Sequence, residues 1–172
     1  FQALGQLYIA PSDGSSAPRK LTRDDGLVEQ DPAWSPDGRS IVYVTWHDDE
    51  LGSVRQVSAR GGRGRVLNTT PGHFRRPVVS EAGVFVERIS GGWLRSPLHG
   101  VETGIVRLSR DGEEWITETG SHAQPVGGEL FVETSGEKGS TKLVAVDIET
   151  GDDRTVATSS MGRSLRISPD GS

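Results

Sequence analysis

Four histidines are the residues in this sequence best suited to metal binding or proton transfer: His47, His73, His99 and His122. A zinc-type site needs three or four ligands that converge on one ion at about 2 Å. None of the histidines stands at an i, i+2 or i+4 spacing from another, and cysteine is absent. We therefore predict no metal site and no bound cofactor.

Motifs for covalent or phosphate chemistry are also missing. The sequence has no G-x-S-x-G, H-x-H, H-E-x-x-H or P-loop pattern. Residues 61–64 (GGRG) are glycine-rich, but they join two expected strands and do not lead from a strand into a helix. No catalytic residue is predicted, and whether the protein is an enzyme stays open, because an active site could lie outside these residues.

Charge and hydrophobicity exclude two classes of partner. The net charge is −5, and the 19 Lys and Arg residues are scattered along the chain, which argues against nucleic acid. No apolar run approaches the ~18 residues of a membrane-spanning helix. The sequence starts at Phe1 without Met or a charged leader, so we expect that a leader or upstream segment has been removed.

The chain is organised around residues 31–44 (DPAWSPDGRSIVYV), which read as two strands joined by a tight turn. The segment returns at 76–87 (RPVVSEAGVFVE) and 124–133 (QPVGGELFVE), and its first half returns at 164–171 (SLRISPDG). The turn glycines Gly38, Gly83, Gly128 and Gly171 are 45, 45 and 43 residues apart. A fixed period of this size indicates a repeat architecture, and Gly38 and Gly83 are expected to have positive φ.

A second hairpin lies between successive copies of the first, at 53–68, 105–118 and 142–157, and another copy occupies 6–22. Four antiparallel strands in about 40–45 residues form the blade of a β-propeller. We predict an all-β propeller segment with three complete blades, at 31–69, 76–119 and 124–158. Partial blades are expected at 1–24 and 164–172. A β-sandwich is the competing all-β fold, but it does not require similar sequences in successive hairpins.

Individual residues of the repeat have structural explanations. Asp37 is expected to cap its turn rather than bind calcium, because one carboxylate per turn supplies too few ligands. Trp34 is expected to pack between blades. Ile41, Tyr43, Val84, Val86, Leu130 and Val132 alternate along the second strands and are expected to form one buried face of each blade.

Strand direction groups the polar loops. If the turns after the first and third strands form one rim, the other loops form the opposite rim. His47 and His99 then follow second strands, His73 and His122 precede first strands, and all four share a rim opposite Asp37 and Asp111. Polar loops also collect histidines by chance. The candidate interaction rim comprises Trp46, His47, Asp48, Asp49, His73, Arg75, Trp93, His99, Glu102 and His122.

The repeat resembles a known family. Residues 32–44 (PAWSPDGRSIVYV), followed by a hairpin and LNTT at 67–70, resemble the TolB-type, or PD40, propeller repeat, and SPDG at 168–171 matches the same signature. The third blade lacks the Ser-Pro-Asp part. The middle blade, with SGGWLRSPLHGVE at 90–102 and TGIVRLSRDG at 103–112, is similar to propellers that precede amidohydrolase-like domains in bacterial exported proteins. Other PD40 propellers precede prolyl-oligopeptidase-type peptidases or act in the Tol-Pal envelope system.

The resemblance implies a non-catalytic scaffold or interaction module within a larger exported hydrolase, located in the periplasm or outside the cell. One alternative is the substrate-gating part of an amidohydrolase or prolyl-oligopeptidase-type peptidase whose active site lies outside this chain. Another is a free-standing TolB-like envelope protein. The partner is expected to be a protein or an adjoining catalytic domain.

The two ends carry a further expectation. The N-terminal residues are expected to supply only the third and fourth strands of a blade and the C-terminal residues only a first strand, which leaves no donor for the second strand. We therefore expect either a parent chain that continues or two copies that join through open blade edges.

Overall fold

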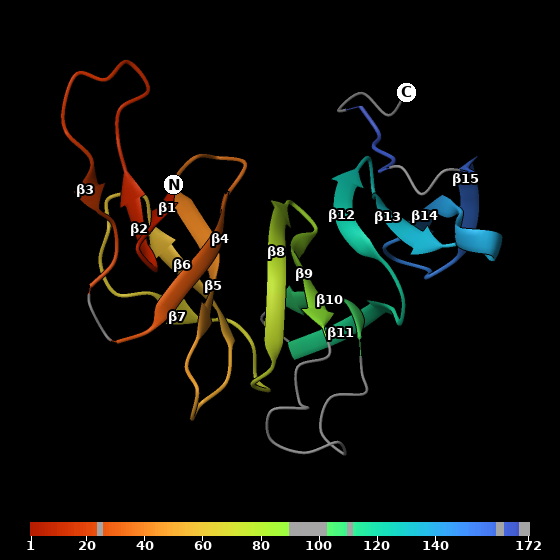
Figure 1. The fold of residues 1–172 in the computed structure, drawn as a ribbon, viewed down its shortest axis with the longest axis horizontal. Coiled ribbons are helices and arrows are strands. Elements are labelled where there is room, and N and C mark those ends of the chain that lie inside the picture. The colour runs from red at the N-terminus through yellow and green to blue at the C-terminus, as the bar shows by residue number, and fades with distance from the viewer. Residues whose placement is uncertain (24–25, 90–102, 110–111, 161–163, 169–172) are drawn as a thin grey trace.

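The strands of the protein are grouped into sheets of consecutive hairpins (Figure 1). The structure, a computed structural model, describes residues 1–23, 26–89, 103–109, 112–160 and 164–168. Within these residues three sheets have four antiparallel strands and one has three. In that part of the chain no helix is long and apolar enough to cross a bilayer. The predicted all-β fold with three complete blades is confirmed.

We name the sheets in chain order. The N-terminal sheet contains β1 (Gln2–Ala3), β2 (Gln6–Ile9) and β3 (Arg19–Lys20). Blade 1 contains β4 (Val28–Trp34), β5 (Ser40–Trp46), β6 (Ser53–Ser58) and β7 (Arg65–Val66). Blade 2 contains β8 (His73–Ser80), β9 (Gly83–Ile89), β10 (Gly104–Ser109) and β11 (Gly112–Thr117). Blade 3 contains β12 (Ser121–Val126), β13 (Glu129–Ser135), β14 (Thr141–Asp147) and β15 (Asp153–Ser159), with the 3-10 turn η2 (Glu137–Gly139) after β13.

The blades stack through both faces of their second strands. In β5, Tyr43 packs towards the N-terminal sheet with Leu7 and Leu21, whereas Val42 and Val44 pack towards blade 2. The predicted core face is confirmed: Ile41, Tyr43, Val86, Leu130 and Val132 are buried, and Val84 is partly buried. The opposite face is buried as well, so all of Ile41, Val42, Tyr43, Val44 and Thr45 are buried in blade 1.

The first strand of each blade contains a β-bulge. The register with the second strand shifts between Gln30 and Ala33 in blade 1, between Arg75 and Val78 in blade 2, and between Ser121 and Gln124 in blade 3. One residue inside each shift has a left-handed backbone: Asp31 (φ 49°), Arg76 (φ 46°) and His122 (φ 55°). This conformation is uncommon outside glycine, so its recurrence marks the bulge as a property of the repeat.

The bulges explain why the first strands start earlier than predicted. They begin at Val28, His73 and Ser121 instead of at residues 31, 76 and 124. A bulge interrupts the period-2 alternation of side chains, so the polar residues before it look like a loop in the sequence. His73 and His122 consequently lie in strands β8 and β12, where loops were predicted.

The end sheets differ from expectation in one respect. β1 pairs with β2 through Gln2 and Leu7 and through Ala3 and Gln6, so β1 occupies the position of a second strand, and the prediction that this strand has no donor was wrong. A two-residue strand is too short to be seen as a pattern in the sequence. Residues 164–168, where a first strand was predicted, belong to no sheet in the described structure.

The turn glycines behave as predicted. Gly38 has φ +67° and Gly83 has φ +133°. In the first turn the Gly38 amide donates to the Ser35 carbonyl at 2.9 Å, and Asp37 accepts hydrogen bonds from Ser35 Oγ at 2.6 Å and the Arg39 amide at 3.0 Å. These two bonds lower the pKa of Asp37, and they occupy its carboxylate as a turn cap.

We predict that Gly38→Ala lowers the free energy of unfolding by about 1 kcal/mol, because alanine resists a left-handed backbone. A Cβ at Gly38 would meet no atom within 4 Å, so backbone strain is the whole effect. Gly38→Asn is the matched control and should cost less, since asparagine tolerates this region. Urea unfolding of the three proteins checks the prediction, and equal losses in both variants would contradict it.

Candidate functional site

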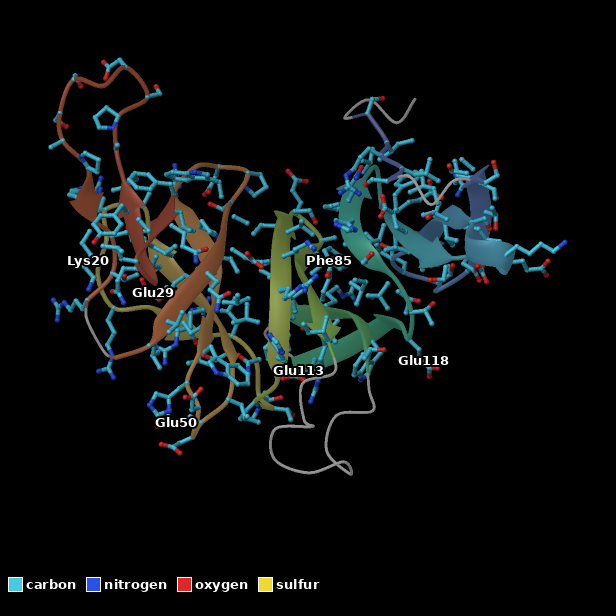
Figure 2. The ribbon with its side chains drawn as sticks, viewed as in Figure 1. Lys20, Glu29, Glu50, Phe85, Glu113 and Glu118 are labelled. Atoms are coloured by element: carbon cyan, nitrogen blue, oxygen red, sulfur yellow. The ribbon has the colours of Figure 1, made fainter. Side chains whose placement is uncertain are left out.

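The hairpin between β5 and β6 presents the first group of predicted rim residues. Trp46 Nε1 donates to Asp48 Oδ1 at 2.8 Å, and the Trp46 ring lies 5.0 Å from the ring of His73 in the next blade. His47 Nδ1 accepts the Asp49 amide at 3.2 Å. Trp46, His47 and His73 are half-buried, whereas Asp48 and Asp49 are exposed. The structure thus brings five predicted residues from two blades into one patch, to which the exposed Glu50 at the tip of the hairpin also belongs (Figure 2).

Of the other predicted rim residues, Arg75 and His122 belong to the described chain, and the rest do not. Arg75 stands opposite Glu87 in the β8–β9 ladder, next to His73, whose pKa is lowered by burial and by the charge of Arg75. His47, His73 and His122 all lie at the end of their blade away from the turn between its first and second strands. Trp93, His99 and Glu102, like Asp111 of the opposite rim, lie outside the described residues. In the described part of the chain, no three His, Asp or Glu side chains are grouped as a metal site.

A second group of polar residues lies on the first and second strands of the blades, at the junctions between blades. Glu87, on β9, is 2% exposed. Its Oε1 accepts the amide of His122 in blade 3 at 2.5 Å, and its Oε2 accepts Arg76 Nη1 at 2.7 Å. The amide of His122 belongs to the bulge of β12, so the carboxylate supplies the partner that the interrupted ladder cannot.

Glu133 makes the same connection from blade 3 to residues 164–168. Its Oε1 accepts the Leu165 amide at 2.6 Å, Ser164 Oγ at 2.7 Å and Arg166 Nη1 at 2.9 Å. His122 Nδ1 lies 3.0 Å from its Oε2. Burial raises the pKa of Glu133, but the bonds from Ser164 and Leu165 and the charges of Arg166 and His122 together hold it below the ordinary 4.5. Glu133 therefore stays ionised to a lower pH than an ordinary glutamate.

The remaining two junctions use carboxylates from the first strand. Asp31 Oδ2 accepts the amide of Arg76, the bulge residue of blade 2, at 2.9 Å. In blade 1 the position equivalent to Glu87 is Val44, which stands opposite Gln30 as Glu87 stands opposite Arg75. The buried Glu29 accepts the Leu7 amide at 2.9 Å and Thr22 Oγ1 at 2.6 Å. We call these four residues, Glu29, Asp31, Glu87 and Glu133, the interblade carboxylates.

The sequence analysis predicted none of the interblade carboxylates. It selected only one of their partners, His122, and as a rim residue. The available signal was the repeat of VFVE at 84–87 and LFVE at 130–133. In each motif a glutamate directly follows three apolar strand residues. A charged group beside a buried apolar run must be paired. These carboxylates hold backbone amides and cations of the protein, which suits them to joining blades and not to acid–base catalysis.

Comparison with solved structures bears directly on this arrangement of bulged, stacked blades. TolB from Acinetobacter baumannii matches with a TM-score of 0.64 and 17% identity over 93% of this chain and 39% of that chain. A putative TolB from Agrobacterium tumefaciens matches with a TM-score of 0.62 and 20% identity over 89% of this chain and 56% of that chain. The fold is a TolB-type β-propeller.

An oligogalacturonate lyase solved in complex with manganese shares the TolB-type fold, with a TM-score of 0.63 and 12% identity over 90% of this chain and 48% of that chain. No family model matches the sequence. The chain spans between 39% and 56% of the length of these three structures. The TolB-type resemblance seen in the PAWSPDG repeat is thus confirmed as a resemblance of fold.

We predict that Arg76→Met lowers the free energy of unfolding by about 1–2 kcal/mol, because it removes the partly exposed cation that pairs with the buried Glu87 carboxylate. In a Glu87→Gln background the same substitution should cost much less, since no charge remains to be paired. Chemical unfolding of both single variants and the double variant measures this coupling, and strictly additive losses would contradict it.

We also predict a pH effect at Glu133. Its folded pKa lies below its unfolded value, so its stabilisation is complete above the unfolded pKa and is lost as the pH falls through the folded pKa. Thermal melts from pH 7 to pH 2 should therefore show a smaller loss of stability in acid for Glu133→Gln than for the wild type. Glu129→Gln, on the same strand and paired with the exposed Arg154, is the control and should follow the wild type.

Proposed function

We propose that this chain is a non-catalytic TolB-type propeller module that binds another protein surface through one rim and belongs to a larger exported hydrolase. The observation that carries the proposal is the patch formed by Trp46, His47, Asp48, Asp49 and His73. It joins two blades, combines aromatic and acidic groups, and leaves its acidic residues exposed. Partly exposed aromatic residues are enriched in protein interfaces.

The interblade carboxylates support the non-catalytic part of the proposal. Each interblade carboxylate accepts hydrogen bonds from the neighbouring blade, sheet or segment. A group committed in this way is a poor general base, because proton uptake would break the bonds that join the blades. The proposal keeps the other residues of the predicted rim, which are Arg75 and His122 within the described residues and Trp93, His99 and Glu102 outside them.

The location and the hydrolase context rest on similarity. The TolB-type fold and the likeness of residues 90–112 to propellers before amidohydrolase-like domains support a periplasmic or extracellular protein with an adjoining catalytic domain. The likeness of residues 90–112 to propellers of this kind also makes the substrate-gating part of an amidohydrolase or prolyl-oligopeptidase-type peptidase the second candidate, and a free-standing envelope protein is the third.

Photo-crosslinking in cells separates these candidates. Benzoylphenylalanine placed at Asp49, on the rim patch, should form crosslinks, and the same group at Arg39, exposed on the opposite end of blade 1, should not. An intramolecular crosslink to a catalytic domain would support the module or gating role, and a crosslink to a separate protein would support the envelope role. Absence of crosslinks from Asp49, or equal crosslinking from Arg39, would refute the rim proposal.

A further inference from the structure

A cleft lies at the junction between blades 2 and 3, towards their outer strands. Its volume is about 390 Å³, which is within the range of pockets that hold ligands. The lining combines aliphatic side chains with hydroxyl and charged groups and includes Ile116, Val132, Thr134, Val144, Asp153 and Thr155.

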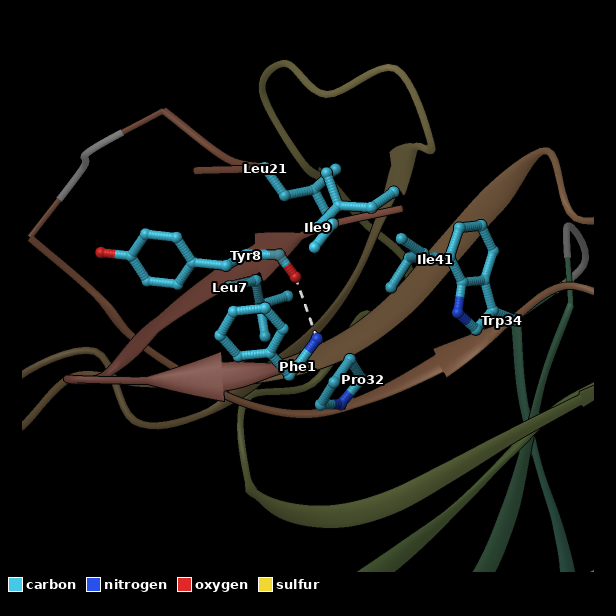
Figure 3. Close-up of a pocket in the computed structure, with 9 residues that line it drawn as sticks. Phe1, Leu7, Tyr8, Ile9, Leu21, Pro32, Trp34 and Ile41 are labelled. Atoms are coloured by element: carbon cyan, nitrogen blue, oxygen red, sulfur yellow. Dashed lines mark hydrogen bonds between the residues drawn. The ribbon is translucent and has the colours of Figure 1, made fainter. Parts of the chain in front are cut away.

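The pocket between the N-terminal sheet and blade 1 is of a different kind (Figure 3). Its lining is mainly apolar and includes Phe1, the first residue of the sequence. Trp34, predicted to pack between blades, lines this pocket but is 53% exposed. The cleft between blades 2 and 3 is bounded by strands and connections inside the chain, so neither end of the sequence contributes to its lining.

The preceding junction, between blades 1 and 2, is closed at the equivalent place. Glu113 Oε1 accepts two backbone amides and a hydroxyl of residues 69–70, at 2.6, 2.8 and 3.0 Å. The Arg88 guanidinium lies 5.8 Å from the ring centroids of both Phe74 and Trp115. The Glu113 side chain is only 13% exposed. A chain segment, two aromatic rings and a cation thus complete this junction.

The strand ladders identify the residues at the same positions in the junction of blades 2 and 3. Glu87 and Glu133 occupy equivalent places on the second strands and set the register. The corresponding residues are Arg88 and Thr134, Trp115 and Thr155, Glu113 and Asp153, and Phe74 and Gly120. Three large side chains are thus replaced by small ones, and the carboxylate is retained.

The connection that leads into the blade is also shorter at this junction. Residues 67–72 link β7 to β8, whereas only residues 118–120 link β11 to β12. The longer connection reaches Glu113. In the described structure no backbone amide donates to the exposed carboxylate of Asp153. The cleft is therefore the place that the chain itself fills one junction earlier, with its acceptor still in position.

We propose that this cleft binds an extended segment of a partner polypeptide that carries an aromatic side chain. The aromatic ring lies on Val132 and Val144, in the space that large side chains fill in the preceding junction. Backbone amides of the segment donate to Asp153, as those of residues 69–70 donate to Glu113. Backbone bonds then supply affinity and the pocket selects the side chain. The site goes beyond the proposed function, because the rim patch joins blades 1 and 2 instead.

Fluorescence anisotropy with a labelled peptide of residues 68–74 (NTTPGHF) tests the proposal, because this segment completes the junction of blades 1 and 2. Binding to the purified chain should saturate. Replacing the peptide's phenylalanine by glycine should weaken binding about tenfold or more, since the burial of an aromatic ring is lost. Asp153→Ala should weaken binding about threefold or more, since the hydrogen bonds to the carboxylate are lost.

Thr155→Trp gives blade 3 the side chain that blade 2 has at the same ladder position. It should fill the cleft and weaken peptide binding about tenfold or more, and an unchanged melting temperature would show that the fold is intact. Val66→Trp is the matched control, because Val66 is 48% exposed and occupies the equivalent position in blade 1. This variant should bind the peptide like the wild type.

The proposal is overturned if anisotropy does not change up to millimolar protein, if the glycine peptide binds equally well, or if Asp153→Ala or Thr155→Trp has no effect. Equal losses in Val66→Trp and Thr155→Trp would overturn it too. Sedimentation equilibrium tests the other occupant: a dimer that Thr155→Trp abolishes would identify a second copy of the chain and refute a separate partner. None of these outcomes depends on the rim, which crosslinking from Asp49 tests separately.

Discussion

Each blade junction of the described chain depends on a hydrogen bond from a backbone amide to a carboxylate of the neighbouring blade, and in two junctions that amide belongs to a β-bulge. A bulge leaves one amide of the inner strand without a ladder partner, and a buried amide without a partner destabilises the fold by about 1–3 kcal/mol. Asp31 and Glu87 meet this requirement for blades 2 and 3, and Glu133 does so for the Leu165 amide. Apolar faces bring the blades together, and these bonds fix their register.

Much of the architecture could be predicted from the sequence because it depends on local patterns. The recurring glycines, the alternating second strands and the regular spacing of hairpins are sufficient for a bladed all-β fold, and the PAWSPDG repeat indicated its TolB-type form. Gly38 and Gly83 have the positive φ that their turns require. These features need no knowledge of which blade faces which.

What could not be predicted depends on contacts between repeats. The bulges at Asp31, Arg76 and His122 have no residue signature of their own, since three different side chains share one backbone conformation. The hydrogen bond between Glu87 and the His122 amide spans 35 residues. In blade 1 the position equivalent to Glu87 holds Val44, so the sequence does not show that Asp31 has the same role. His122 was selected as a rim residue, but the contact of its ring nitrogen with Glu133 at a blade junction was not predicted.

The substitution of Asp31 for the missing glutamate has a consequence for how such a protein can be duplicated or recombined. The acceptor for a given bulge lies on the first strand in one junction and on the second strand in another. Each blade nevertheless carries one acceptor for whatever follows it: Asp31 in blade 1, Glu87 in blade 2 and Glu133 in blade 3. A crossover that exchanges whole blades would therefore keep one acceptor at every boundary. The geometry at the new boundary would still differ, because an aspartate on a first strand and a glutamate on a second strand reach the following amide from different places.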